Sequence, residues 1–229
     1  MSSLKQPKYI LFDVGNVLVY KVTHEDENVA KILNLTREKY RSILDRLIED
    51  QSDSEKREFK GMNTVGKEKE YLDNLHEKIC NYLNIDFDKD FIDKMTDYRM
   101  KGDFALKEDT AEALELLSKK YVLGIFSNAL PSRRTHELRI NNIDRYFKHI
   151  FISKEIGVEK PDLNSYEYVL SQIGFKTEEI MFVDDKLDYL EGAKAAGIEN
   201  LVLLKNKEIS DKYIMFNNLL ELANALIKN

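Results

Sequence analysis

The chain has 229 residues, of which 43% are hydrophobic and 33% are charged, so a packed core under a well-solvated surface is expected. Its formal net charge of −6 argues against nucleic acid as the main partner. The single cysteine excludes an internal disulfide framework and fits a reducing compartment. There is no signal-peptide pattern at the N-terminus and no apolar run of membrane-spanning length, so we expect a cytoplasmic protein with no membrane partner.

The first predicted element is a strand over residues 8–12, a short apolar run rich in aromatic and β-branched residues, as in strands buried on both faces. It ends in Asp13, and Gly15 then allows a tight turn out of the sheet. Ligands of open α/β sheets bind at the carboxyl ends of strands, so Asp13 is well placed for chemistry. The alternative is that Asp13 only caps a turn or a helix.

The next segment, taken as residues 21–101, is rich in Lys, Glu and Asp and carries apolar residues at helical intervals. The spacing predicts amphipathic helices around residues 29–33, 40–48, 72–83 and 91–98. The charge run at 53–58 is expected to be a solvated helix face. These features predict an inserted all-helical domain of about 80 residues, near the lower size range of domains.

Beyond residue 101 helices and strands alternate. Strands are predicted at residues 121–126, 149–152, 180–183 and 200–204, and helices at 108–120, 161–172, 187–196 and 217–227. Together with the first strand this makes a mostly parallel five-stranded sheet built from βαβ units. The predicted fold class is α/β, a Rossmann-like three-layer core formed by residues 1–20 and 102–229.

Polar residues follow three of the predicted strands, namely Asp13, Ser127 with Asn128, and Asp184 with Asp185. In a parallel sheet these strand ends meet at one edge, where gathered carboxylates repel one another and favour a cation with oxygen ligands such as Mg²⁺. A hydroxyl, an amide and Lys160 beside that cation suit a phosphate group. Taken singly, the same residues are also compatible with a turn, a helix cap and a surface lysine.

With four motifs in order, at residues 12–18, 126–128, 153–162 and 182–198, the chain resembles the haloacid dehalogenase-like hydrolase superfamily, which consists mostly of Mg²⁺-dependent phosphatases. The resemblance implies that residues 21–101 are a helical cap that covers the active site and selects a small phosphorylated substrate, such as a sugar phosphate. It implies that Asp13 is the nucleophile and forms an aspartyl-phosphate that water hydrolyses.

The resemblance also implies a role for each residue of the site. Mg²⁺ would be bound by Asp13, the backbone carbonyl of Gly15, Asp184 and Asp185. The phosphate group would be bound by Gly15, Asn16, Ser127, Asn128 and Lys160. Ser127 would donate to a phosphoryl oxygen with support from Asn128, and Lys160 would offset the phosphate charge. Asp13, Ser127 and Lys160 form the implied catalytic set.

The main departure from the family pattern is Gly15, where a second aspartate usually protonates the leaving oxygen and then activates water. That work contributes about 10²–10⁴-fold to such reactions. Two hypotheses therefore stay open, a phosphatase in which another group or a good leaving group compensates, and a weakened member that binds a phosphorylated ligand or a protein partner. Tyr189, where relatives often have Asn, is a second departure. Arg133 and Arg134 are expected to be surface residues, and the alternative is that they reach a second anionic group.

Overall fold

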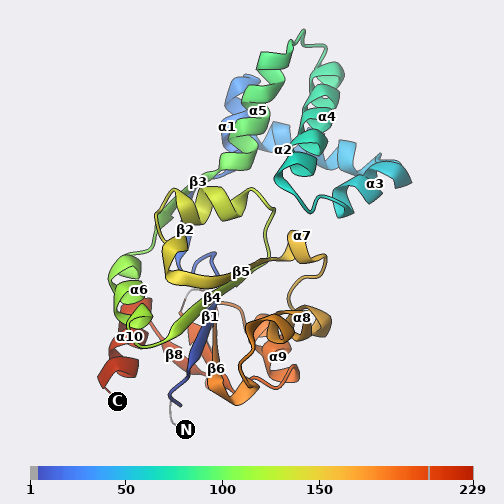
Figure 1. Cartoon of the computed structure of the whole chain (residues 1–229). Coiled ribbons are helices and arrows are strands. Elements are labelled where there is room, and N and C mark those ends of the chain that lie inside the picture. The colour runs from blue at the N-terminus through green and yellow to red at the C-terminus, as the bar shows by residue number, and fades with distance from the viewer. Residues whose placement is uncertain (1–4, 206, 229) are drawn as a thin grey trace.

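The centre of the molecule is a parallel sheet. The computed structural model, which describes residues 5–205 and 207–228, orders its strands β5-β4-β1-β6-β7-β8 with every neighbouring pair parallel (Figure 1). The strands are β1 (Tyr9–Phe12), β4 (Val122–Ser127), β5 (Phe147–Ile152), β6 (Ile180–Asp184), β7 (Asn200–Leu204) and β8 (Ile214–Phe216). The α/β class and the parallel sheet are confirmed, but the prediction of five strands is wrong. The sixth strand, β8, has only three residues, too few for a strand pattern to stand out.

Helices cover both faces of the sheet, which makes the three layers predicted for a Rossmann-like fold. They are α6 (Thr110–Ser118) and α10 (Leu219–Lys228) on one face, and α8 (Leu163–Ile173) and α9 (Leu187–Ala195) on the other. Strand β1 shows why, since side chains alternate across a strand. Ile10 and Phe12 pack in the cluster that contains α6 and α10, whereas Tyr9 and Leu11 pack with α8 and α9.

Five helices form an insertion that follows β1 in the chain. They are α1 (Glu25–Ile32), α2 (Arg37–Glu49), α3 (Asp53–Lys60), α4 (Val65–Leu83) and α5 (Lys89–Lys101). Side chains at their N-caps stabilise four of these helices, for example Ser52 and Glu55 in a capping box at the start of α3. No residue of α3 is buried, in line with the solvated helix face predicted for its charge run. We refer to residues 25–101 as the helical insertion.

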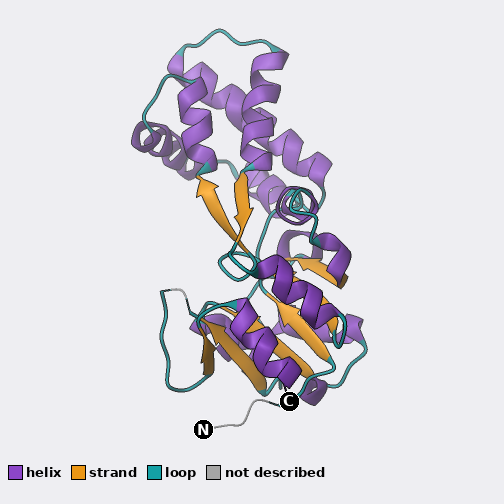
Figure 2. Ribbon diagram, turned by 90° about the vertical axis from the view of Figure 1, so that its left-hand side faces the viewer, coloured by secondary structure: helices purple, strands orange, loops and turns teal. Residues whose placement is uncertain are grey.

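The helical insertion has its own apolar core and is joined to the sheet by a two-stranded antiparallel ribbon. That core includes Val29, Tyr40, Leu75 and the buried Cys80. The ribbon pairs β2 (Val19–Thr23) with β3 (Asp103–Leu106), and Figure 2 shows it between the helices and the main sheet. Residues 21–23, which the sequence analysis assigns to the helical segment, therefore belong to a strand.

The remaining elements are short connections around the edge of the sheet. They are a π-helix η1 (Arg134–Arg139), 3₁₀ turns η2 (Asp144–Tyr146) and η3 (Thr177–Glu179), and α7 (Ser153–Ile156). Helix α8 begins two residues after Pro161 because Asp162 is its N-cap and accepts a hydrogen bond from the backbone of Asn164. None of the helices that the structure describes is both long and apolar enough to cross a membrane.

Candidate active site

Three buried carboxylates meet where β1 and β6 end. The two strands are parallel neighbours with Phe12 opposite Val183, and the backbone N–H of Asp13 donates to the carbonyl of Val183 at 3.0 Å. This pairing places Asp13 beside Asp184 and Asp185, and carboxylate oxygens of all three lie within 4.8 Å of one another. The convergence expected from the strand ends is therefore present.

Lys160 lies between two of these carboxylates. Its ammonium group donates to Asp13 Oδ1 at 2.7 Å and to Asp184 Oδ2 at 2.8 Å, and its side chain is fully buried. Burial lowers the pKa of Lys160, but the two carboxylates more than offset this and hold the pKa above its usual value. The ammonium therefore stays charged, and a surface lysine is excluded.

Aromatic rings and an asparagine hold Lys160 in place. The ammonium lies over the rings of Phe126, Phe182 and Tyr189, at 5.3, 5.4 and 4.6 Å from their centroids. The amide of Asn128 accepts from the backbone N–H of Lys160 at 2.9 Å and donates to its carbonyl at 2.8 Å. The Asn128 side chain thus fixes Lys160 and also lines the pocket, and its expected support of a phosphate contact stays a prediction.

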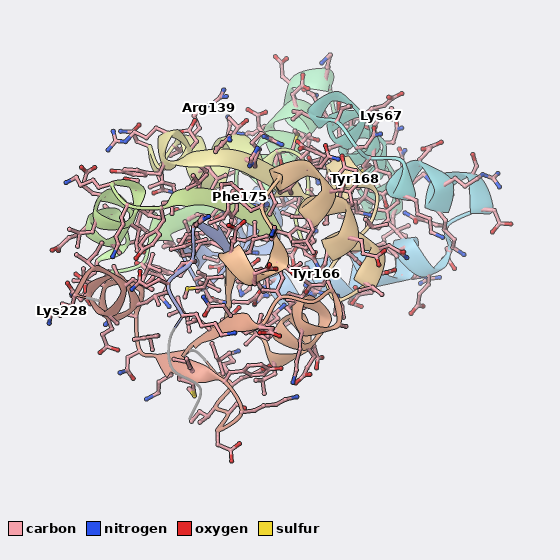
Figure 3. The ribbon with its side chains drawn as sticks, turned by 60° about the horizontal axis from the view of Figure 1, so that its bottom comes forward. Lys67, Arg139, Tyr166, Tyr168, Phe175 and Lys228 are labelled. Carbon is pink, nitrogen blue, oxygen red and sulfur yellow. The ribbon has the colours of Figure 1, made fainter. Side chains whose placement is uncertain are left out.

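The aromatic support extends to helix α8. Tyr166, labelled in Figure 3, packs edge-on against Phe126 and Phe182 and donates its hydroxyl to the carbonyl of Tyr189 at 2.7 Å. Tyr168 on the same helix is exposed, so α8 presents one aromatic residue to the interior and one to solvent.

The acidic cluster has the composition of a site for a hard divalent cation. Its donors are all oxygen atoms, and the ammonium of Lys160 pairs with two of the three carboxylates, Asp13 and Asp184. Burial raises the pKa of Asp184 to about 7, and the charge of Lys160 only partly opposes this. The residues present therefore fit a cation, since further positive charge would relieve the repulsion that remains among the carboxylates.

Asn16 lies beside this cluster in a left-handed conformation, with φ at 60°. Its side-chain amide donates to Asp185 Oδ2 at 3.2 Å, and its backbone N–H donates to the carbonyl of Val19 at 2.7 Å. Its own carbonyl accepts from the ammonium of Lys107 at 2.6 Å. Asn16 thus orients Asp185 and also lines the pocket beside Asp13, and the phosphate contact expected of it stays a prediction.

Asp13 and Asp185 of this cluster line a pocket of about 160 Å³. Its lining includes Asp13, Gly15, Asn16, Ser127, Asn128, Ala129, Glu137, Asp185, Lys186 and Tyr189. A second hollow of about 370 Å³ shares five of these residues and extends to Lys21, Phe104 and Arg133. The structure therefore brings six of the predicted site residues to one cavity, namely Asp13, Gly15, Asn16, Ser127, Asn128 and Asp185. The predicted residues Lys160 and Asp184 bond to each other outside that lining.

Sequence reasoning missed Glu137, which lies on η1 and lines both hollows. No motif or apolar period marks this glutamate in the sequence. The expectation that Arg133 is a surface residue is wrong, because its side chain is only 11% exposed and forms ion pairs with Glu25 and Glu137. Arg134 is partly exposed and pairs with Glu155.

The helical insertion contacts the segment that leaves β4. Glu68 of α4 is completely buried and accepts from the backbone N–H of Ser132 at 2.9 Å and from its hydroxyl at 2.7 Å. Leu130 packs against the apolar core of the insertion, and Glu25 at the start of α1 pairs with Arg133. The insertion is therefore bonded to the same segment that lines the pocket.

Comparison with known proteins gives a family and a fold. A family model for haloacid dehalogenase-like hydrolases matches residues 7–197. The chain is 31% identical over 103 residues to a glyceraldehyde 3-phosphate phosphatase of Methanothermobacter thermautotrophicus, covering 44% of this chain and 45% of that protein. It is 30% identical over 99 residues to a phosphorylated carbohydrates phosphatase of Thermotoga maritima, covering 42% and 46%. Each match spans less than half of the relative's length.

A solved structure with the same fold over the full length is the 2-haloacid dehalogenase of Pseudomonas syringae, with a TM-score of 0.69, 18% identity and coverage of 97% of this chain and 99% of that one. At this identity the likeness concerns the fold alone. The family model covers most of the chain, including the acidic cluster, Ser127 and Lys160. The chain belongs to the haloacid dehalogenase-like hydrolases.

Proposed function

We propose that this protein is a Mg²⁺-dependent phosphatase that hydrolyses a small phosphorylated metabolite, such as a sugar phosphate, through an aspartyl-phosphate on Asp13. The observation that carries the proposal is the buried pair of hydrogen bonds from Lys160 to Asp13 and Asp184 at the edge of a pocket that also contains Ser127. The relatives named as phosphatases of glyceraldehyde 3-phosphate and of phosphorylated carbohydrates support the substrate class.

In this proposal Asp13, Asp184, Asp185 and the carbonyl of Gly15 hold Mg²⁺. The bound ion supplies positive charge that offsets the repulsion between the carboxylates and a phosphate group. Lys160 holds Asp13 in one orientation through the bond to Oδ1, which leaves the second carboxylate oxygen to attack phosphorus in line. The Ser127 hydroxyl, at the end of β4, donates to a phosphoryl oxygen and orients the group.

The same proposal divides the chain into a catalytic core, residues 1–20 and 102–229, and a substrate-selecting helical cap, residues 21–101. The separate apolar core of the helical insertion supports this division. So does the ribbon of β2 and β3, through which the chain enters and leaves the insertion.

A second candidate function is binding of a phosphorylated ligand without turnover, which Gly15 favours because it has no side chain to move a proton. The two functions differ in what they require of Asp13, since only turnover needs a nucleophile.

The test is release of inorganic phosphate from a panel of sugar phosphates, nucleotides and small phosphorylated acids, with Mg²⁺ and with chelator. We expect Asp13→Asn to lower the rate by about 10³-fold or more. Asp188→Asn, an exposed acid in the first turn of α9, is the matched control and should leave the rate unchanged. Phosphate release that persists in Asp13→Asn or in chelator would contradict the proposal, and binding without release would favour the second candidate.

A further inference from the structure

Gly15 leaves the proposed reaction without the acid that relatives place after the nucleophile, and a different carboxyl group stands in the pocket. We propose that Glu137 is the general acid and base of this enzyme, protonating the leaving oxygen in the first step and activating water in the second. This inference rests on the phosphatase function proposed above.

The position of Glu137 carries the argument. It is one of the residues that line both the smaller pocket, with Asp13 and Ser127, and the larger hollow, with Lys21 and Arg133. A phosphate ester can bind with its phosphoryl group at Asp13 and the rest of the molecule in the larger hollow. Its bridging oxygen then lies in the region that the two hollows share. That bridging oxygen is the atom that needs a proton when the ester bond breaks.

Glu137 is also distinct from the carboxylates proposed to bind the metal. Among the described residues, the acidic cluster consists of Asp13, Asp184 and Asp185. Glu137 lies on η1, an element separate from β1 and β6, and its Oε1 is 3.7 Å from Arg133 Nε. The Arg133 side chain pairs with Glu25 as well, so its charge is shared between two carboxylates.

The electrostatic surroundings of Glu137 suit proton transfer. Burial raises the pKa of Glu137 to about 7, Arg133 and Lys21 oppose this, and Asp13 and Glu25 add to it. Both protonation states are therefore populated near neutral pH, which is what a residue that first donates and then accepts a proton requires.

The space beside Asp13 is open at Gly15. Among the described residues beyond its two chain neighbours, a methyl group there would meet Asp13 Oδ2 alone, at 3.9 Å, which is an ordinary contact. The Cβ atom of an aspartate at position 15 would therefore fit without a clash. Because Gly15 has no side chain, nothing at this position stands between the leaving oxygen and Glu137.

The proposed proton transfers balance over the two steps. In the first, an Asp13 oxygen attacks phosphorus, the bond from phosphorus to the ester oxygen breaks, and that oxygen takes the electron pair and the proton of Glu137. In the second, water attacks phosphorus, its proton passes to Glu137, and the bond from phosphorus to Asp13 breaks. The products are the alcohol and inorganic phosphate, and both carboxyl groups return to their starting state.

The test compares Glu137→Gln with the wild type on two substrates, the best sugar phosphate of the panel and 4-nitrophenyl phosphate. Nitrophenolate leaves without a proton, so the first step no longer needs the acid, whereas the second step still needs the base. For the sugar phosphate we expect kcat to fall by about 10²–10³-fold. For 4-nitrophenyl phosphate we expect the aspartyl-phosphate to accumulate to near one per protein, measured by mass spectrometry after acid quench.

The matched control is Glu155→Gln. Glu155 forms an ion pair with Arg134 of η1, but it lines neither hollow. This variant should behave as the wild type. Adding Gly15→Asp to Glu137→Gln should restore turnover of the sugar phosphate, because it supplies an acid beside Asp13.

Unchanged kcat in Glu137→Gln, or an equal loss on both substrates without accumulated aspartyl-phosphate, would overturn the role of Glu137 while Asp13-dependent release by the wild type still stands. If the proposed phosphatase function is wrong, the result is different: phosphate release does not need Asp13, and the wild type never forms the aspartyl-phosphate. That result would overturn both the phosphatase function and the role of Glu137.

Discussion

Replacing Lys160 with methionine should destabilise the protein strongly, because it removes the one ammonium group that bridges Asp13 and Asp184. Each of the two lost bonds is charge-assisted and contributes about 1.5–3 kcal/mol, or about 3–6 kcal/mol together. Leaving buried carboxylates without their partner destabilises proteins by about 3–5 kcal/mol. The two ranges overlap, and we expect a loss of about 4 kcal/mol, which for a chain of this size lowers Tm by about 8–16 °C.

The assay is urea and thermal unfolding in chelator at pH 8. The pKa of Asp184 is about 7 in the wild type and rises further when the Lys160 charge is removed, so the loss is largest at high pH. The matched control is Lys194→Met, which changes an exposed lysine in the last turn of α9, outside the pocket. Its expected effect is within about 0.5 kcal/mol. Adding Mg²⁺ should recover part of the Lys160→Met loss, up to about 2.7 kcal/mol at a hundred times its Kd.

A loss below about 1 kcal/mol in Lys160→Met, or one equal to that of the control, would refute the reasoning. It would mean that the ammonium does not hold the carboxylates together and that other interactions offset the repulsion between them.

Three further substitutions concern stability away from the carboxylates. Burial lowers the pKa of His76 to about 4, so the unfolded chain binds a proton below pH 6.5 that the folded chain does not, and stability should fall by about 1.4 kcal/mol per pH unit from pH 6.5 towards 4. His76→Asn keeps a hydrogen-bond partner for the Thr96 hydroxyl. The difference in unfolding free energy between the wild type and this variant should follow that slope. A difference that does not change with pH would exclude the lowered pKa of His76 as its cause. Gly192→Ala would place a methyl group 2.7 Å from the Tyr166 ring and should destabilise the protein by about 1–3 kcal/mol in chemical denaturation. Gly66→Ala, in α4 with no atom near the new methyl group, should instead be neutral or stabilising by up to about 1 kcal/mol.

The sequence allows the sheet and the carboxylate cluster to be predicted because both depend on local signals. A short apolar run that ends in an aspartate marks a buried strand and its carboxyl end together, as at Asp13 and Asp184. Parallel pairing then brings the strand ends together without any knowledge of loops. The strand at Ile214–Phe216 carries too short a signal, so it is missed.

Which residues surround the carboxylate cluster depends on the path of the loops that follow the strands, and the sequence does not show this path. Glu137 lines the pocket from η1, which packs against β3 of the ribbon, and Asn128 bonds to Lys160 across 32 positions of the chain. The roles of Asn16 and Asn128 follow from which neighbour their amides meet. Residue type alone shows that these side chains can donate and accept, and not what they contact.

The bond between Glu68 and Ser132 has a consequence for exchanging parts between related proteins. Leu130, Ser132 and Arg133 belong to the core by sequence position, yet they pack against or bond to the helical insertion. A graft that transfers residues 25–101 alone would leave the Glu68 carboxylate buried opposite a foreign segment. The transferable unit is therefore discontinuous, the insertion together with the segment from Leu130 to Glu137, and a change of substrate preference by grafting would carry the proposed proton-transfer residue along with it.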